Sequence, residues 1–273
     1  MNHRLHGLNR LTRIILILVI GITAIGVTAW ITKPMELPSD VIIIRPLPIE
    51  DNPYQKEYDE MLSPCVRIET LTGVGSGVII PHRKDAKDAK GYVYILTAGH
   101  VVGNYANVDV TFYSYSKEGT NPPERLFSWA GTLNASVVMT DTAKDLALLE
   151  IRNPKSEIRN WATAKLAPRN YQPYLFSPVW VVGCSLGLNP RPSSGCISVI
   201  GGFSWEISAP VLPGNSGGPV YDAGTHELIG IAVWVRLYGD QLVTTMAGIV
   251  PINVIYEFLE AFNRKDAKAL SNS

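Results

Sequence analysis

The sequence predicts an all-β domain of the barrel or sandwich kind, with one apolar helix before it and one amphipathic helix at its end. From Cys65 onward, short runs rich in Val, Ile, Thr and aromatic residues are interrupted by Gly and Pro, which is typical of strands joined by turns. Many short strands in one domain favour a barrel or a sandwich. The expected strands are Val66–Thr70, Gly77–Ile80, Tyr92–Thr97, Val108–Tyr113, Ser136–Thr140, Ala147–Ile151, Pro178–Val182, Ile197–Gly201, Gly218–Tyr221, Leu228–Val235 and Thr244–Pro251.

The segment Ile14–Thr32 carries no charge and predicts a transmembrane signal-anchor helix. As a helix it would be about 28 Å long, close to the thickness of the hydrocarbon core of a bilayer. Positive charges precede it at Arg4, Arg10 and Arg13. Because positive charge stays on the cytoplasmic side, residues 1–13 are expected in the cytoplasm and the remaining chain outside it.

A cleaved signal peptide is the alternative interpretation of this segment, because Val27, Thr28 and Ala29 are small residues that could form a cleavage site. The apolar run is longer than that of most signal peptides, which favours an anchor. Under either interpretation the domain that follows is expected to be extracytoplasmic, in a periplasm or outside the cell.

Prolines recur through residues 33–61, which predicts an extended linker with a short helix at Tyr54–Leu62. At the other end of the chain, apolar residues recur at helical spacing in Ile252–Ala261, and Asn253 is the expected cap. Residues 263–273 are expected to form a polar tail.

Composition excludes several classes of function. Lys and Arg number 24, as do Asp and Glu, so the net charge is zero and no basic patch indicates nucleic-acid binding. His3 and His6 lie before the apolar segment, and His82 and His226 have no partners at metal-ligand spacing, so no metal or cofactor is expected. The three cysteines are too few for a disulfide scaffold. They are either buried thiols or include a bridge between Cys184 and Cys196 across a hairpin.

Three residues suited to acyl transfer stand at the ends of predicted strands or in turns. A histidine ends one apolar strand, an aspartate opens another, and a serine lies in a glycine-rich turn; these are His100, Asp145 and Ser216. Each pattern alone is commonplace and would usually be structural. Their order along the chain, however, is one of the known convergent arrangements for acyl transfer.

The chemistry of acyl transfer needs these residue types. A serine hydroxyl such as that of Ser216 is a poor nucleophile unless an adjacent base takes its proton. His100 would be that base, since histidine titrates near neutral pH. Asp145 would fix the imidazole tautomer and stabilise the imidazolium. The backbone N–H groups of Gly214 and Ser216 would form the oxyanion hole.

These blocks resemble the trypsin/chymotrypsin-like serine protease superfamily, and most closely its DegP/HtrA-like branch. Further stretches similar to that branch are Gly73–Ile79, Gly183–Leu188, Ser194–Ser198 and Gly248–Asn253. The resemblance covers most of residues 62–262, which are therefore expected to be a serine protease domain. It implies two antiparallel six-stranded β-barrels with the triad in the cleft between them, and protein or peptide substrates. Because many HtrA-like enzymes are trimers, it also implies an oligomer.

The chain departs from that branch in two places. HtrA-like enzymes usually carry a C-terminal PDZ domain, and this sequence ends shortly after the expected last helix. Asn215 stands where many zymogen-type relatives have an aspartate that pairs with a newly cut N-terminus. Asparagine cannot form that ion pair, so activity without zymogen cleavage is expected.

By the same resemblance, the substrate-binding S1 pocket is lined by Pro210 and by Val233, Trp234 and Val235. Pro210 stands six positions before the nucleophile (216−210), where an acidic residue would select Arg or Lys. Val235 should narrow the pocket, so a small aliphatic P1 residue such as Val or Ala is expected. The alternative is that Val235 is ordinary strand packing. The strand itself is expected to pair with an extended substrate.

Two other functions fit parts of this sequence. The segment Gly214–Gly218 also fits the nucleophile turn of α/β-hydrolases, but that fold needs its catalytic histidine last in the chain, and only His226 follows. The second alternative is a catalytically silent, membrane-tethered binding module on a protease fold, because a fold does not determine function. Reaction of Ser216 with a fluorophosphonate would distinguish an enzyme from such a module.

Overall fold

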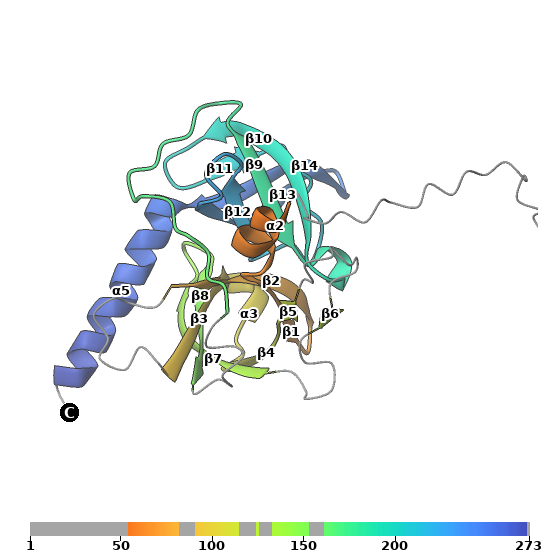
Figure 1. Cartoon of the computed structure of the whole chain (residues 1–273). Coiled ribbons are helices and arrows are strands. Elements are labelled where there is room, and N and C mark those ends of the chain that lie inside the picture. Colours follow the sequence, from red (N-terminus) through yellow and green to blue (C-terminus); the bar gives the residue numbers. More distant parts are fainter. Residues whose placement is uncertain (1–53, 82–90, 115–123, 126–132, 153–160, 272–273) are drawn as a thin grey trace, which may run out of the picture. The chain divides into compact units, whose positions relative to one another are not determined.

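The computed structural model describes residues 54–81, 91–114, 124–125, 133–152 and 161–271, which form two β-barrels and a C-terminal helix (Figure 1). The expected transmembrane segment Ile14–Thr32 and most of the expected linker lie outside the described residues. Within the described ranges, no helix combines the length and the apolar character needed to cross a bilayer. The expected fold of two closed, six-stranded antiparallel barrels is confirmed.

Barrel 1 closes in the order β1-β2-β3-β8-β7-β4. In β3 and β8, side chains alternate between two buried faces, because Ile95 and Leu149 point into the barrel while Leu96 and Leu148 join a second core outside it. Burial on both faces explains the long apolar runs of β3 and β8. The strands are β1 (Cys65–Thr70), β2 (Gly73–Ile80), β3 (Tyr92–Ala98), β4 (Asn107–Thr111), β7 (Leu133–Asp141) and β8 (Leu146–Arg152).

Barrel 2 closes in the order β10-β11-β14-β13-β12-β9. Two features differ from the expected strands. β10 begins at Arg191 and not at Ile197, because its polar first half pairs with β9 without an apolar pattern. β11 was not expected, since three residues are too few to show alternation. The strands are β9 (Pro178–Gly183), β10 (Arg191–Ile200), β11 (Trp205–Ile207), β12 (Pro219–Asp222), β13 (Leu228–Tyr238) and β14 (Gln241–Pro251).

Short elements connect the strands. The helix expected before the domain is present as two joined turns, of which the second is a π-helix. The short elements are α2 (Gln55–Glu57), η1 (Tyr58–Leu62), α3 (Gly99–Val102), η3 (Ser185–Gly187) and the paired strands β5 (Tyr113–Ser114) and β6 (Glu124–Arg125).

One hydrophobic core joins both barrels to helix α5 (Ile252–Ser271). The helix buries Ile255, Phe258 and Phe262. The Phe262 ring meets Tyr94 of barrel 1 edge-on, with 5.8 Å between ring centroids. Figure 1 accordingly shows α5 leaving barrel 2 and running beside β3 and β8 of barrel 1.

The C-terminal helix differs from its prediction at both ends. It begins at Ile252, so Asn253 lies in its first turn and is not the cap. It ends at Ser271, so most of the expected polar tail of residues 263–273 is helical. The physical reason is that the residues after Phe262 include no Gly or Pro to stop the helix.

All three cysteines are unbridged. Cys196 is in register with Pro178 at one end of β9, whereas Cys184 follows Gly183 at the other end, so the alternative of a bridge between Cys184 and Cys196 is wrong. Cys184 instead meets Cys65 of barrel 1. Burial, and then the hydrogen bond with Cys184, raise the pKa of the Cys65 thiol.

Candidate active site

His100 lies on α3, a single helical turn that follows β3 directly. The turn ends because Gly103, at φ 51°, donates its N–H to the carbonyl of Gly99. A helix this short leaves the imidazole at the surface, where 47% of the side chain is exposed. His100 is therefore accessible to a substrate.

Asp145 lies in the turn between β7 and β8, at φ 52°. This left-handed backbone costs a non-glycine residue about 1–2 kcal/mol, although aspartate tolerates it better than most. The pairing of Ala98 with Leu146 places the start of β8 beside the end of β3. The approach at position 99 is close, because a Cβ there would lie 3.2 Å from Asp145 Oδ1. The local fold thus delivers Asp145 to the base of α3.

Two hydrogen bonds join His100 to Asp145. His100 Nδ1 lies 2.7 Å from Asp145 Oδ2, and the His100 backbone N–H donates to Asp145 Oδ1 at 2.8 Å. When Nδ1 donates its proton to the carboxylate, Nε2 carries the lone pair of the neutral ring. The structure therefore brings together two of the residues that the sequence singled out.

The environment of Asp145 keeps it ionised. Burial alone would raise the pKa of this carboxyl, but hydrogen bonds from the His100 ring and backbone outweigh burial and lower the pKa below its ordinary value. A carboxylate with a lowered pKa stabilises the fold above its unfolded pKa, and that stabilisation is lost as pH falls through the lowered value. The His100–Asp145 pair is therefore sensitive to acid and stable at neutral pH.

Ser216 follows a tight turn between β11 and β12. The Asn215 N–H donates to the Leu212 carbonyl at 2.9 Å, with Pro213 and Gly214 between them. Gly214 has φ 96°, which makes this a type II turn with proline and glycine at their preferred positions. The glycine-rich motif is thus explained by backbone geometry.

The Ser216 turn packs against barrel 1 beside α3. The Ser76 N–H of β2 donates to the Ser216 carbonyl at 2.8 Å. A Cβ on Gly75 would lie 3.2 Å from that carbonyl and 2.6 Å from the side chain of Val101, the neighbour of His100. Ser216 and α3 therefore both lie against Gly75 of β2. Among the hydrogen bonds of the described residues, none joins His100 to the Ser216 hydroxyl.

The Gly214 amide is oriented by its neighbours. The Pro213 carbonyl accepts a hydrogen bond from the Leu186 N–H at 2.6 Å. In a trans peptide the C=O and N–H point in opposite directions, so the Gly214 N–H points away from Leu186. Outside regular helices and strands, neither Gly214 nor Ser216 donates its N–H to another backbone carbonyl of the described residues.

The residues expected to line S1 occupy different environments. Pro210 is exposed, and its carbonyl accepts from Ser193 Oγ at 2.8 Å. The register of β13 against β14 shifts at Val233, which is buried, whereas Val235 is half-buried against the core. Trp234 is exposed and covers Gly248, where a Cβ would lie 1.9 Å from the indole.

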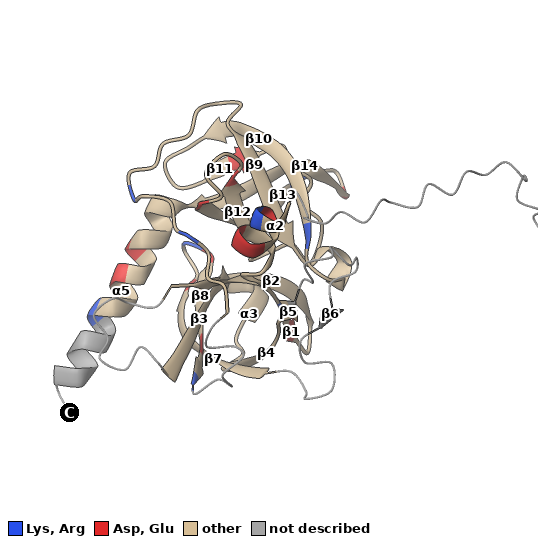
Figure 2. Cartoon of the chain, viewed as in Figure 1, with Lys and Arg blue, Asp and Glu red and all other residues tan. Residues whose placement is uncertain are grey.

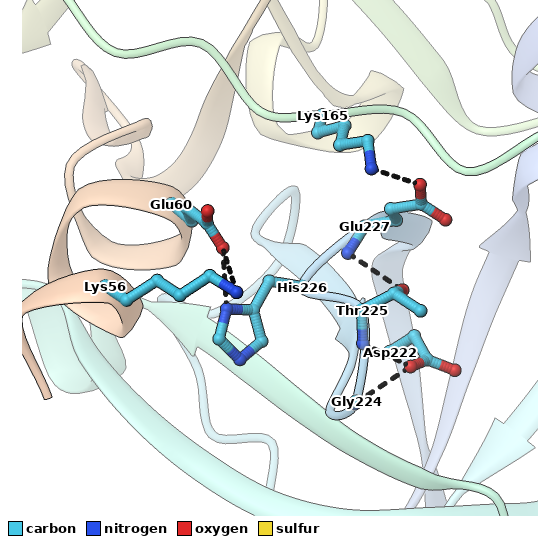
Figure 3. A network of polar contacts seen from close by, with 8 residues as sticks. All are labelled: Lys56, Glu60, Lys165, Asp222, Gly224, Thr225, His226 and Glu227. Carbon is cyan, nitrogen blue, oxygen red and sulfur yellow. Dashed lines mark hydrogen bonds and ion pairs between the residues drawn. The ribbon is translucent and has the colours of Figure 1, made fainter.

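His226 belongs to a separate polar network (Figure 3). Its Nδ1 lies 2.7 Å from Glu60 Oε2 in η1, and Lys56 lies 4.0 Å from the same carboxylate oxygen. A second ion pair joins Lys165 to Glu227 at 2.7 Å. With its ring bonded to Glu60, and in an antiparallel all-β fold, His226 does not fit the α/β-hydrolase alternative.

In the described residues, the charged side chains and the groove beside α5 do not indicate a second kind of functional site. Figure 2 shows acidic and basic residues close together at α2 and along α5. No cluster of His, Cys, Asp and Glu in the described part of the chain could hold a metal ion. A groove of about 640 Å³ beside α5 is lined by residues such as Ile80, Leu166 and Tyr256, and by none of the expected site residues.

Comparisons with known proteins identify the family to which the chain belongs. Residues 75–231, more than half of the chain, match the family model of the trypsin-like peptidase domain. The periplasmic serine endoprotease DegP of Salmonella typhimurium is 32% identical over 172 residues, which cover 60% of this chain and 30% of that protein. A serine protease HtrA-like of Staphylococcus epidermidis is 28% identical over 225 residues, covering 72% of this chain and 32% of that protein. The chain thus spans less than half the length of these relatives.

Solved structures share the fold. The serine endoprotease from Yersinia pestis superposes with a TM-score of 0.57 at 22% identity, covering 78% of this chain and 67% of that one. The HtrA-type protease AlgW with tripeptide gives a TM-score of 0.59 at 21% identity, covering 77% of this chain and 63% of that one. With the family match over residues 75–231, these findings show that the chain belongs to the trypsin-like peptidase domain family, with HtrA and DegP proteins among its relatives.

Proposed function

We propose that this chain is a membrane-tethered serine endopeptidase in which His100, Asp145 and Ser216 form the catalytic triad. The observation that carries the proposal is the double hydrogen bond between His100 and Asp145, next to the turn that presents Ser216. The names of the relatives, which are serine proteases and endoproteases, support peptide-bond hydrolysis as the reaction.

Acylation would begin when Ser216 Oγ attacks the carbonyl carbon of the scissile bond and His100 Nε2 takes its proton. The negative charge that develops on the carbonyl oxygen would be bound by the N–H groups of Gly214 and Ser216. Asp145 would stabilise the imidazolium without taking its proton. His100 would then protonate the leaving amine as the C–N bond breaks, which leaves an acyl ester on Ser216.

Deacylation would repeat these steps with water in place of the serine. His100 would remove a proton from the water, whose oxygen attacks the ester carbonyl, and would return the proton to Ser216 Oγ as the ester bond breaks. The products are a carboxylate and an amine, and the enzyme is regenerated. No metal or cofactor takes part in this sequence.

The test of this function is active-site labelling of the purified full chain in mild detergent. A fluorophosphonate should attach covalently to Ser216 and abolish peptide hydrolysis, and peptide mass mapping identifies the modified residue. A folded chain without an adduct on Ser216 and without hydrolysis would instead support the catalytically silent binding module.

Tethering by residues 14–32 is part of the proposal, with the N-terminus in the cytoplasm and the protease domain outside it. The support is the uncharged Ile14–Thr32 segment with Arg4, Arg10 and Arg13 before it. The chain should stay with the membrane fraction after extraction with alkaline carbonate. Mass spectrometry of the mature protein should show its N-terminus intact; release into the supernatant with a new N-terminus near Ala29 would identify a signal peptide.

We further propose a small aliphatic P1 residue, Val or Ala. No carboxylate stands at Pro210 to select a basic residue, and Val235 occupies the strand beside the expected S1 pocket. Profiling with a proteome-derived peptide library should therefore show Val and Ala at P1 and little Arg or Lys. The Ser216→Ala chain supplies the background, and a profile dominated by basic or aromatic residues would contradict the proposal.

The role of Val235 has its own test. Val235→Gly should shift the preference towards larger P1 residues, since apolar pockets discriminate by about 1–3 kcal/mol per methylene. Ile231→Val is the control, because Ile231 is buried in the same strand outside the expected S1 residues and should affect stability and not specificity. If Val235→Gly only lowers the melting temperature and leaves the profile unchanged, Val235 is a packing residue.

A further inference from the structure

Ser76 is a fully buried polar residue in the middle of β2, and the triad chemistry leaves it without a role. Its hydroxyl donates to the Gly214 carbonyl at 2.7 Å and accepts from the Cys184 N–H at 2.8 Å. Its backbone N–H donates to the Ser216 carbonyl at 2.8 Å. One residue of barrel 1 therefore contacts two loops of barrel 2, and one of these loops carries the nucleophile.

Hydrogen bonds hold the peptide planes on both sides of Gly214. The plane before it is held through the Pro213 carbonyl, which accepts from the Leu186 N–H. The plane after it is held through the Gly214 carbonyl, which accepts from Ser76 Oγ. The turn bond from the Asn215 N–H to the Leu212 carbonyl also holds the second plane. Because Gly214 is a glycine at φ 96°, its backbone depends on these hydrogen bonds for its orientation.

The loop that supplies the Leu186 bond is itself tied to barrel 1 at two points. At its start, the Cys184 N–H donates to Ser76 Oγ. At its end, Arg67 Nη1 donates to the Gly187 carbonyl at 3.0 Å. Within the loop, the Gly187 N–H donates back to the Cys184 carbonyl at 2.9 Å and closes the turn. Barrel 1 therefore supplies the bond to the Gly214 carbonyl directly and supports the loop that supplies the bond to the Pro213 carbonyl.

We propose that Ser76, assisted by Arg67, is a positioning residue that holds the Gly214 N–H in the orientation required for an oxyanion hole. This inference rests on the proposed function, because it assigns a role within the same site. Ser76 does not touch the substrate; it acts through the peptide planes of Gly214 and through the 184–187 loop. The oxyanion hole is then competent only while the two barrels are docked.

The test is the kinetics of Ser76→Ala in the full chain. Removing one oxyanion donor lowers kcat by about 10²–10³-fold, so a loss of roughly 10²-fold is expected with KM changed less than about twofold. Affinity for a peptide aldehyde, whose hemiacetal oxygen binds in an oxyanion hole, should fall by a similar factor. A purely structural role would lower the melting temperature and reduce activity only in proportion to the folded fraction.

Tyr171→Phe is the matched control. It removes one partly buried hydroxyl, whose bond to Asp222 Oδ2 is 2.6 Å long, without contact to the Gly214 turn. It should lower stability and leave kcat and aldehyde affinity unchanged. Ser76→Cys, which keeps a weak donor, should recover part of the lost kcat.

Arg67→Met is a second test variant. Its kinetics test the proposal if Ser76→Ala does not fold. It keeps the aliphatic stem and removes the bond to Gly187, so kcat should fall by about tenfold at unchanged KM. If a folded Ser76→Ala chain keeps wild-type kcat and aldehyde affinity, the inference is wrong and the proposed function is unaffected. If Ser76→Ala does not fold, the same result in Arg67→Met has the same meaning. Absence of hydrolysis and of fluorophosphonate labelling in the wild type refutes the proposed function itself.

Discussion

Replacing Ser216 with alanine is expected to lower kcat for peptide hydrolysis by about 10⁶-fold, because the members of a triad act as a unit. The alanine lacks the oxygen that attacks the carbonyl and forms the acyl-enzyme. The melting temperature should hardly change, since the turn around Ser216 is held by backbone hydrogen bonds from Ser76 and Gly217. The measurement is steady-state hydrolysis of a fluorogenic peptide, with a thermal melt of the same sample.

Ser204→Ala is the control for this experiment. Ser204 lies between β10 and β11, where its hydroxyl contacts only the Trp205 carbonyl among the described residues, at 3.4 Å. It should keep wild-type kcat and the fluorophosphonate adduct on Ser216. Substantial hydrolysis by Ser216→Ala would show that another residue is the nucleophile.

Replacing Asp145 with asparagine should lower kcat by about 10⁴-fold at neutral pH through the wrong imidazole tautomer. Both carboxylate oxygens of Asp145 accept hydrogen bonds from His100, one from the ring and one from the backbone. Asparagine has one acceptor oxygen and one NH₂ group. If that oxygen stays with the backbone N–H, the NH₂ faces Nδ1 and moves the ring proton to Nε2. His100 can then no longer accept the proton of Ser216.

Asp141→Asn is a closely matched control for Asp145→Asn, because Asp141 stands in the same β7–β8 turn. Its Oδ1 accepts from the N–H groups of Ala143 and Lys144, and asparagine can keep those bonds. Activity should stay within about threefold of wild type, and the lost ion pair with Lys144 should cost less than about 1 kcal/mol. Equal losses in both variants would assign the effect to the turn and not to the tautomer.

Much of the site could be predicted because its signals are local. His100 and Asp145 stand at the ends of apolar strands that both faces of barrel 1 bury, so the runs that mark β3 and β8 are unusually clear. The glycines around Ser216 are explained by the backbone, because φ is positive at Gly214 and Gly217. The order of His100, Asp145 and Ser216 along the chain then indicated that the three residues could form a catalytic triad.

The features that escaped prediction depend on how the barrels dock. Ser76 is a serine between two glycines, and its only local signal is a polar residue in an apolar strand. That its hydroxyl meets Gly214 follows from contacts between distant parts of the chain. The meeting of Cys65 with Cys184 has the same origin. Strand β11 was missed for a different reason, because three residues show no periodicity.

The hydrophobic core shared by both barrels and α5 also affects how the chain folds during synthesis. Barrel 1 is complete in sequence at Arg152, but Leu96 and Leu148 on its outer face belong to a core that is formed mostly by residues synthesised later. Phe262, which meets Tyr94, belongs to the last element of the chain. A growing chain therefore exposes an apolar surface until α5 has emerged, and such surfaces invite aggregation and chaperone binding. By the same logic, a chain made only as far as Arg152 also lacks Ser216, so the proposed triad is incomplete at that stage.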